Sequence, residues 1–287
     1  MLQQTIQNPV EITGVGLHSG EAVTLILQPA PTNTGIVFRR TDMAGSPEIP
    51  ALAQNVCDTR MCTTLKQGAA SVATVEHVLS ALQALQIDNL YLDVSAPELP
   101  VLDGSSFVFV EALQKVGVKQ QSGAKQYIKV LKTVRVEDGD KWAELVPYDG
   151  FKVVFDIEYN HPAIVSTALH YEFELSDLEQ YKSDISKART YGFLKEYEWL
   201  KANNLARGGS LENALVLDEE KIMNPDGLRV PDEFVKHKIL DAIGDMYLVG
   251  KSLKACYRGY KSGHGLNNQL ALALMRDPSA FEIVEVL

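Results

Sequence analysis

The order of candidate strands and helices is the feature that most restricts the fold of this chain. Residues 1–30 alternate apolar and polar side chains between turn glycines, which predicts antiparallel strands. Candidate helices follow at about 70–87 and 105–117, with a strand at 89–95 between them. The polar stretch 120–125 then interrupts the pattern and is the best candidate for a domain boundary.

The second half repeats this order. It begins with three candidate strands, at 127–136, 142–146 and 151–159. Two candidate helices follow, at 184–202 and 232–253. Strands followed by paired helices, twice over, predict two α+β layers that pack helix to helix. No sequence identity links the halves, so the repeat could also be coincidental.

The last of these helices carries two side chains that can bind a metal ion. His237 and Asp241 are four residues apart, so a helix places them on one face with their Cβ atoms roughly 5–6 Å apart. Pro231-Asp232 is a start signal for this helix and Gly250 is a stop signal. The apolar face carries Val235, Ile239, Ala242, Ile243 and Met246. Imidazole with carboxylate suits Zn²⁺, and one protein ligand of a catalytic site is still missing.

Among the six histidines of the chain, His77 is a suitable third ligand. It directly follows Glu76, and Thr74 is a candidate cap for the helix that contains both. His264 lies between two glycines, which allow the backbone to bring an imidazole close to a substrate. Glu76 and His264 would then remain for proton transfer. A His-x-x-x-Asp pair is common on helices, however, and the same residues could be ordinary helix and turn residues.

Six motifs in the same order give this chain a resemblance to a known family, the UDP-3-O-acyl-N-acetylglucosamine deacetylases, which are zinc amidases of lipid A synthesis. The motifs lie at Gly14–Gly20, Thr74–His77, Asp103–Ser105, Arg189–Phe193, His237–Asp245 and Lys261–His264. The resemblance runs from residue 1 to about residue 275. Tyr191 departs from the family, in which Phe is more usual, and the chain ends at Leu287, somewhat early.

The resemblance implies an α+β fold of two β-α-α-β two-layer sandwich domains, packed helix to helix with the active site between them. It implies an N-terminal domain at 1–122 with a small insert and a C-terminal domain at 123–287. The insert of the second domain, at about 193–222, is expected to form a passage for the acyl chain of the substrate.

The implied reaction is hydrolysis of the acetamide of UDP-3-O-[(R)-3-hydroxyacyl]-N-acetylglucosamine to the free amine and acetate. One catalytic Zn²⁺, or alternatively Fe²⁺, is expected on His77, His237 and Asp241. The resemblance gives a catalytic role to four further residues. Glu76 is the general base; His264, held by Asp245, stabilises the oxyanion or protonates the leaving amine; and Thr190 donates its hydroxyl to the oxyanion.

Substrate binding needs cations and an aromatic surface for the nucleotide, and an apolar slot for the acyl chain. Lys238 and Lys261 flank the expected metal site. The resemblance places Tyr191 at the site and Glu158 and Tyr159 against the uracil, although a strand tyrosine more often packs in a core. The expected acyl-chain contacts are Leu194, Tyr197, Ala206, Leu211, Ala214 and Val216. These could instead be core residues, since apolar residues at helical spacing usually are. No role is expected for His18.

Two other functions use the same residues. One is a zinc amidase that acts on a different N-acyl substrate. The other is a binding or scaffold protein with a structural zinc ion, although three protein ligands beside Glu76 argue against a structural site, which usually has four.

Composition adds limits. A formal net charge of −10 argues against a nucleic-acid surface. No run of about 18 apolar residues predicts a membrane span. The three cysteines have no Cys-x-x-Cys spacing, and the N-terminus has no signal-peptide pattern. These limits favour a cytoplasmic enzyme. The partner that the resemblance implies is the acylated UDP-amino-sugar substrate, and we expect a monomer.

Overall fold

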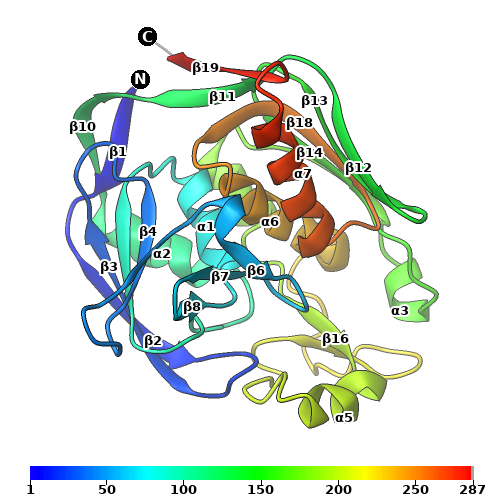
Figure 1. The fold of residues 1–287 in the computed structure, drawn as a ribbon. Coiled ribbons are helices and arrows are strands. Elements are labelled where there is room, and N and C mark those ends of the chain that lie inside the picture. The colour runs from blue at the N-terminus through cyan, green and yellow to red at the C-terminus, as the bar shows by residue number, and fades with distance from the viewer. Residues whose placement is uncertain (286–287) are drawn as a thin grey trace.

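The computed structural model describes residues 1–285 and has a mixed α+β architecture, as expected. Its helices α1, α6 and α7 (His264–Arg276) lie in the centre, between a sheet of the N-terminal half and a sheet of the C-terminal half (Figure 1). Helix α1 (Glu76–Ala84) packs along α6 (Glu233–Tyr247), and this is the most extensive contact between helices. The helix-to-helix arrangement expected from the sequence is therefore present.

The sheet of the N-terminal half has the strand order β2-β3-β9-β4-β5. Neighbouring strands are antiparallel except β4 and β9, which are parallel. The bounds of these strands are Val10–Val15, Ala22–Pro29, Leu90–Val94, Ile36–Arg40 and Glu48–Pro50. Helix α2 (Phe107–Val116) contacts α1. A small insert sheet comes after β5 in the chain, beyond a 3-10 turn at Ala53–Asn55. Its strands are β6 (Val56–Asp58), β7 (Thr64–Gln67) and β8 (Ala70–Val72).

The sheet of the C-terminal half follows the order β12-β13-β18-β11-β19, with β14 also paired to β18 and β15 to β14. The bounds of these strands are Val134–Asp138, Lys141–Pro147, Ser252–Tyr260, Gln126–Val130, Phe281–Glu285, Phe151–Asp156 and His170–Glu174. The remaining helices are α3 (Pro162–Val165), α4 (Leu178–Asp184), α5 (Leu194–Ala202) and α7 (His264–Arg276). Strands β16 (Tyr191–Phe193) and β17 (Leu215–Leu217) form a parallel pair that enters and leaves the segment with α5, at the bottom of Figure 1.

Several expected element bounds are wrong. Helix α1 begins only at Glu76, because 70–72 form strand β8, and the 184–202 region is divided among α4, β16 and α5. The expected helix 232–253 ends at Tyr247, before the positive φ of Gly250, and β18 follows. Thr74 does not cap α1: its φ is 58°, and its hydroxyl donates to Glu98 instead.

The polar stretch 120–125 also differs from expectation. It belongs largely to strand β10 (Val118–Ala124), which pairs with β1 (Leu2–Ile6) instead of forming an irregular linker. Backbone hydrogen bonding to the N-terminal strand gives this polar sequence its extended form. The division at 122/123 stays a prediction.

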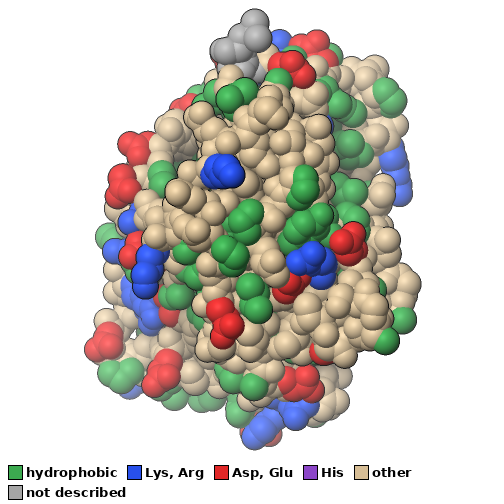
Figure 2. Space-filling view, turned by 90° about the vertical axis from the view of Figure 1, so that its left-hand side faces the viewer, with side chains coloured by type: hydrophobic (Ala, Val, Ile, Leu, Met, Phe, Trp, Pro, Cys, Tyr) green, Lys and Arg blue, Asp and Glu red, His purple; other side chains and the backbone are tan. Residues whose placement is uncertain are grey.

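The surface and the described helices add two observations. On the face shown in Figure 2, acidic and basic side chains are interspersed, so the negative formal charge is not gathered into one patch there. Within residues 1–285, no helix is long and apolar enough to cross a membrane.

Candidate active site

The side chains of His77, His237 and Asp241 meet where α1 crosses α6. One ligand atom from each lies within 4.8 Å of the others, and all three residues are buried. The Nε2 atoms of His77 and His237 lie 3.7 and 3.3 Å from Oδ1 of Asp241. The spacing of four on α6 therefore places the two side chains on one face, as expected, and α1 supplies the third.

The charge states of these groups suit a metal cation. Nδ1 of His237 donates to the carbonyl oxygen of Ala188 at 3.0 Å, which leaves its Nε2 as the unprotonated ligand atom. Burial lowers the pKa of His237 to about 3, so the imidazole is neutral at physiological pH. Burial opposes the charge of Asp241, but His237 and Lys238 outweigh it and hold the pKa of Asp241 well below its ordinary value.

The strongest evidence that a metal ion fits is an unsatisfied oxygen. Among residues 1–285, Oδ1 of Asp241 is buried without a hydrogen-bond partner, while Oδ2 accepts from Nζ of Lys238 at 2.8 Å. A buried carboxylate oxygen without a donor is costly unless a cation binds it. Two imidazoles and one carboxylate are a donor set that zinc prefers in catalytic sites.

Gly244 explains how α1 and α6 approach so closely. A Cβ atom at this position would lie 2.0 Å from the carbonyl oxygen of Glu76 and 2.8 Å from its carbonyl carbon. Both are backbone atoms, so no side-chain movement could relieve the overlap. The absence of a side chain at Gly244 thus allows α1 to bring Glu76 and His77 against α6.

Glu76 and His264 face each other beside the metal-binding cluster. Nε2 of His264 lies 3.8 Å from Oε1 of Glu76, and the other oxygen of Glu76 accepts a hydrogen bond from the backbone N–H of Thr63 at 3.0 Å. Burial raises the pKa of Glu76. Burial opposes the charge on His264, but Asp245 and Glu76 outweigh it and raise the pKa of His264 to about 9. At neutral pH His264 is therefore an imidazolium. It lies beside the carboxyl group of Glu76, which binds a proton more readily than an ordinary glutamate does.

Asp245 orients His264 from behind. Its Oδ2 accepts from Nδ1 of His264 at 2.9 Å and from Nδ2 of Asn267 at 2.8 Å. Its Oδ1 accepts from the hydroxyl of Thr63 at 2.7 Å. The second ring nitrogen of His264 is consequently directed away from Asp245, towards Glu76.

A cavity of about 320 Å³ opens in front of these groups. Thr190 lines it, and within the described residues the Thr190 hydroxyl forms no hydrogen bond, so it can donate to a ligand. Tyr191, Lys238 and Tyr159 also line the cavity. The hydroxyl of Tyr191 donates to that of Tyr159 at 3.1 Å, and the Tyr191 ring lies edge-on to His237. The phenol at position 191 thus adds a polar link to the cavity wall.

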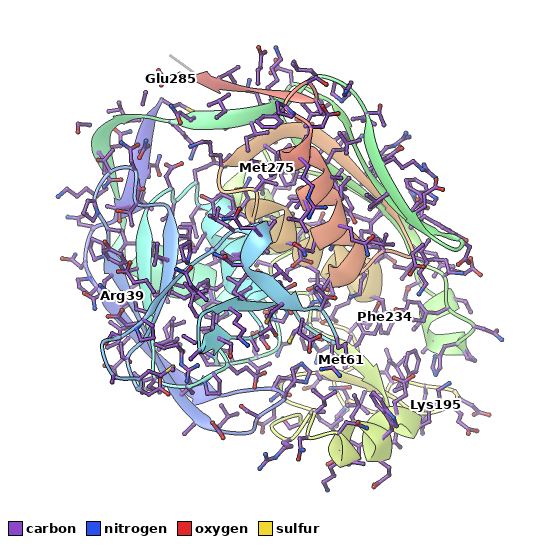
Figure 3. All side chains as sticks on the ribbon, viewed as in Figure 1. Arg39, Met61, Lys195, Phe234, Met275 and Glu285 are labelled. Atoms are coloured by element: carbon purple, nitrogen blue, oxygen red, sulfur yellow. The ribbon has the colours of Figure 1, made fainter. Side chains whose placement is uncertain are left out.

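A second, more apolar cavity of about 320 Å³ adjoins the first, and the two share Thr190, Tyr191 and Met61 in their walls. In Figure 3, Met61 lies between the body of the molecule and the segment that carries Lys195 on α5. All six acyl-chain contacts expected from the sequence line this second cavity: Leu194, Tyr197, Ala206, Leu211, Ala214 and Val216.

Two expected substrate-binding residues lie away from the cavity walls. Nζ of Lys261 contacts Asp140 at 2.5 Å and Glu158 at 3.6 Å. Glu158 also accepts a hydrogen bond from the hydroxyl of Tyr260. Lys261 and Glu158 are therefore close to each other, but neither is among the residues that line the metal-side cavity.

Three residues around the site had no role expected from the sequence. Thr63 lies in no recognisable motif. His18, which had no expected role, lines both cavities, and its buried Nε2 has no hydrogen-bond partner within the described residues. Its backbone N–H is held by the buried carboxylate of Glu98 at 2.9 Å. Asn267 was also missed, although its position three residues after His264 on one helix was a readable signal.

Comparisons with known proteins show similarity along the whole chain. The sequence model of the LpxC family, UDP-3-O-acyl N-acetylglycosamine deacetylase, matches residues 3–276. A Shewanella piezotolerans protein named UDP-3-O-acyl-N-acetylglucosamine deacetylase is 52% identical over 285 residues, which are 99% of this chain and 93% of the relative. Proteins of the same name from Shewanella frigidimarina and Shewanella oneidensis have the same identity and coverage. The similarity therefore spans both halves of the chain and the whole range that contains the site residues.

Proposed function

The chain belongs to the UDP-3-O-acyl-N-acetylglucosamine deacetylase family, and from this premise we propose how its own residues perform the reaction. The reaction is the metal-dependent hydrolysis of the acetamide of UDP-3-O-acyl-N-acetylglucosamine to the free amine and acetate, in lipid A biosynthesis. One observation carries the proposal: Glu76 and His264 open onto the same cavity as the His77, His237 and Asp241 cluster.

We propose that His77, His237 and Asp241 hold one zinc ion. The unsatisfied Oδ1 of Asp241 and the unprotonated Nε2 of His237 support this assignment. When bound, zinc supplies Lewis acidity to the amide carbonyl and lowers the pKa of water from about 15.7 towards 7.

Glu76 is the proposed general base. Its Oε2 is occupied by the N–H of Thr63, which leaves Oε1 to accept a proton from the attacking water. Burial, which raises the pKa of Glu76, also brings its basicity closer to that needed at neutral pH.

His264 is the proposed acid. With its pKa raised to about 9, it is protonated at neutral pH and can stabilise the oxyanion and then protonate the leaving amine from Nε2. Asp245 positions it through Nδ1. The free hydroxyl of Thr190 is a second donor for the oxyanion, in the same cavity wall.

Lys238 is the proposed cation for the anionic part of the substrate nearest the metal ion. Burial opposes its charge, but Asp241 outweighs burial and raises the pKa of Lys238, so the ammonium stays charged in the cavity wall. Tyr159 and Tyr191 offer aromatic surface beside it. Glu158 and Lys261 are proposed contacts of the nucleotide at the outer edge, where the two already pair.

The adjoining apolar cavity is the proposed passage for the acyl chain. Its position directly beside Thr190 and Tyr191 favours an acylated substrate over an N-acyl sugar that lacks the chain. An N-acyl substrate without a long apolar chain would leave this cavity unused, so that alternative is the weaker one.

Two further proposals concern the state of the enzyme. The site residues come from a single chain, which supports catalysis by a monomer. Family membership supports the expected cytoplasmic location.

A comparison of two substrates tests the proposal. We expect rapid deacetylation of UDP-3-O-acyl-N-acetylglucosamine, much slower deacetylation of the same sugar nucleotide without its acyl chain, and loss of both activities on chelation. Equal rates on the two substrates would contradict the acyl passage and favour another N-acyl substrate. Full activity in a chelator that removes all metal would contradict the metal site.

A further inference from the structure

Thr63 connects the two central helices through all of its polar groups. Its backbone N–H donates to Oε2 of Glu76 at 3.0 Å, and its carbonyl oxygen accepts from the N–H of Val75 at 3.4 Å. Its hydroxyl donates to Oδ1 of Asp245 at 2.7 Å. Because Thr63 is buried, water cannot replace these hydrogen bonds without a change in packing.

The first consequence concerns the two oxygens of Glu76. The N–H of Thr63 occupies Oε2, so the carboxylate cannot rotate freely, and Oε1 remains directed towards Nε2 of His264 at 3.8 Å. Residue 63 thus determines which oxygen of Glu76 is available to accept a proton.

The second consequence concerns Asp245. Its Oδ2 is shared by His264 and Asn267, and the Thr63 hydroxyl holds the other oxygen. Donors on both oxygens fix the plane of the carboxylate. The plane of Asp245 in turn fixes the direction in which the imidazole of His264 presents Nε2.

We propose that Thr63 is a positioning residue that sets the general base Glu76 and the Asp245–His264 pair relative to each other. The inference rests on the roles of Glu76 and His264 proposed above. Thr63 is not among the residues that line either cavity, so it acts through the two carboxylates and not by contact with the substrate.

This placement predicts a specific kinetic effect. Thr63→Val keeps the backbone N–H and the branched shape but removes the hydroxyl, so Asp245 loses one donor. We expect kcat to fall roughly tenfold to a hundredfold, the size associated with one hydrogen bond to a charged group, while KM and metal content stay unchanged. Thr63→Ser, which keeps the hydroxyl, should restore most of the lost turnover.

A matched control lies at the next residue. The hydroxyl of Thr64 contacts Cys62 Sγ at 3.8 Å and neither carboxylate, so Thr64→Val makes the same chemical change at the adjacent residue, where β7 begins. Its kcat should equal that of the parent. If Thr63→Val lowers the melting temperature strongly, Thr63→Ser and Thr63→Ala provide the comparison, since these two variants differ by the hydroxyl alone.

A double variant tests whether Thr63 acts through His264. In a His264→Gln background, Asp245 has no imidazole to orient, so adding Thr63→Val should cost much less turnover than it does in the parent. Equal costs in both backgrounds would overturn the proposal. It would also be overturned if Thr63→Val matched Thr64→Val, or if the Ser and Ala variants had the same kcat.

Failure of this inference can be told apart from failure of the proposed function. Normal turnover in Glu76→Gln would remove the general base itself. Loss of turnover in Glu76→Gln together with parental turnover in Thr63→Val would leave the proposed function intact and reject only the role of Thr63.

Discussion

Replacing Glu76 by Gln separates proton transfer from metal binding and from folding. Gln has nearly the same shape, so its side-chain carbonyl can still accept the N–H of Thr63 in place of Oε2. The group that then faces His264 is an amide nitrogen, which cannot accept a proton. The change therefore removes one chemical ability and leaves the position of the side chain intact.

The expected loss follows from the size of general-base catalysis. Such a group contributes roughly 10²–10⁴ in rate, which corresponds to about 2.7–5.4 kcal/mol of transition-state stabilisation. The loss should fall on kcat, because the proposed proton transfer to Glu76 belongs to the chemical step and not to substrate binding.

The folded state of Glu76→Gln should be as stable as that of the parent, or more stable. Burial raises the pKa of Glu76, so its protonated form is favoured by folding, and the stability this provides is lost as the pH rises through the raised value. At neutral pH the Glu76 charge thus opposes folding, and the neutral Gln does not. A melting temperature at or above that of the parent is expected, which would exclude unfolding as the cause of lost activity.

Steady-state kinetics, metal analysis and thermal melting of the two proteins are the assays. The pH profile of the residual activity is a further readout, because the charge of Glu76 helps to raise the pKa of His264, and its removal should move the alkaline limb to lower pH. Near-parental kcat with metal retained would refute the assignment of Glu76 as the base. Loss of metal together with activity would show that Glu76 supports the metal site instead.

Three other predictions concern the metal site, the acid and the acyl passage. His237→Ala should lose most bound zinc and nearly all activity, measured by metal analysis after dialysis; full occupancy would contradict the ligand set. Activity of the parent should decline as pH rises through about 9, where His264 loses its proton, and His264→Gln should weaken this limb; an unchanged limb would assign it to another group. Leu211→Glu should penalise a long-chain substrate, for which each buried CH₂ contributes up to about 0.8 kcal/mol, but spare a short-chain analogue. Equal losses on both substrates would contradict contact between Leu211, which is 42% exposed in the cavity wall, and the acyl chain.

Site residues can be predicted from the sequence when they lie on one regular element and their side chains suit the same chemistry. His237 and Asp241 could be paired because both lie on one continuous helix, where a spacing of four has a defined geometry. His77 could be proposed as a ligand but not placed, because its distance from α6 depends on tertiary packing. That packing depends on Gly244, whose missing side chain has no local signal that distinguishes it from other helical glycines.

The errors have a common physical origin. Thr74 has the chemistry of a helix cap, yet its hydroxyl is taken by Glu98, which is distant in sequence. Residues 120–124 are polar enough for a linker, yet pairing with β1 makes them a strand. Thr63 is one of several threonines, and only the folded chain shows that its groups reach both Glu76 and Asp245. In each case a long-range hydrogen bond overrides the local preference.

Two features that make this site reactive also oppose folding. Burial disfavours the charge of Glu76 and raises its pKa, and Oδ1 of Asp241 is buried without a donor within the described residues. Such groups persist only where the surrounding structure holds them. Here the close approach of α1 to α6 at Gly244 and the hydrogen bonds of Thr63 provide that support. A metal ion bound by His77, His237 and Asp241 would satisfy the open oxygen and join the same two helices, so catalysis and stability depend on one contact.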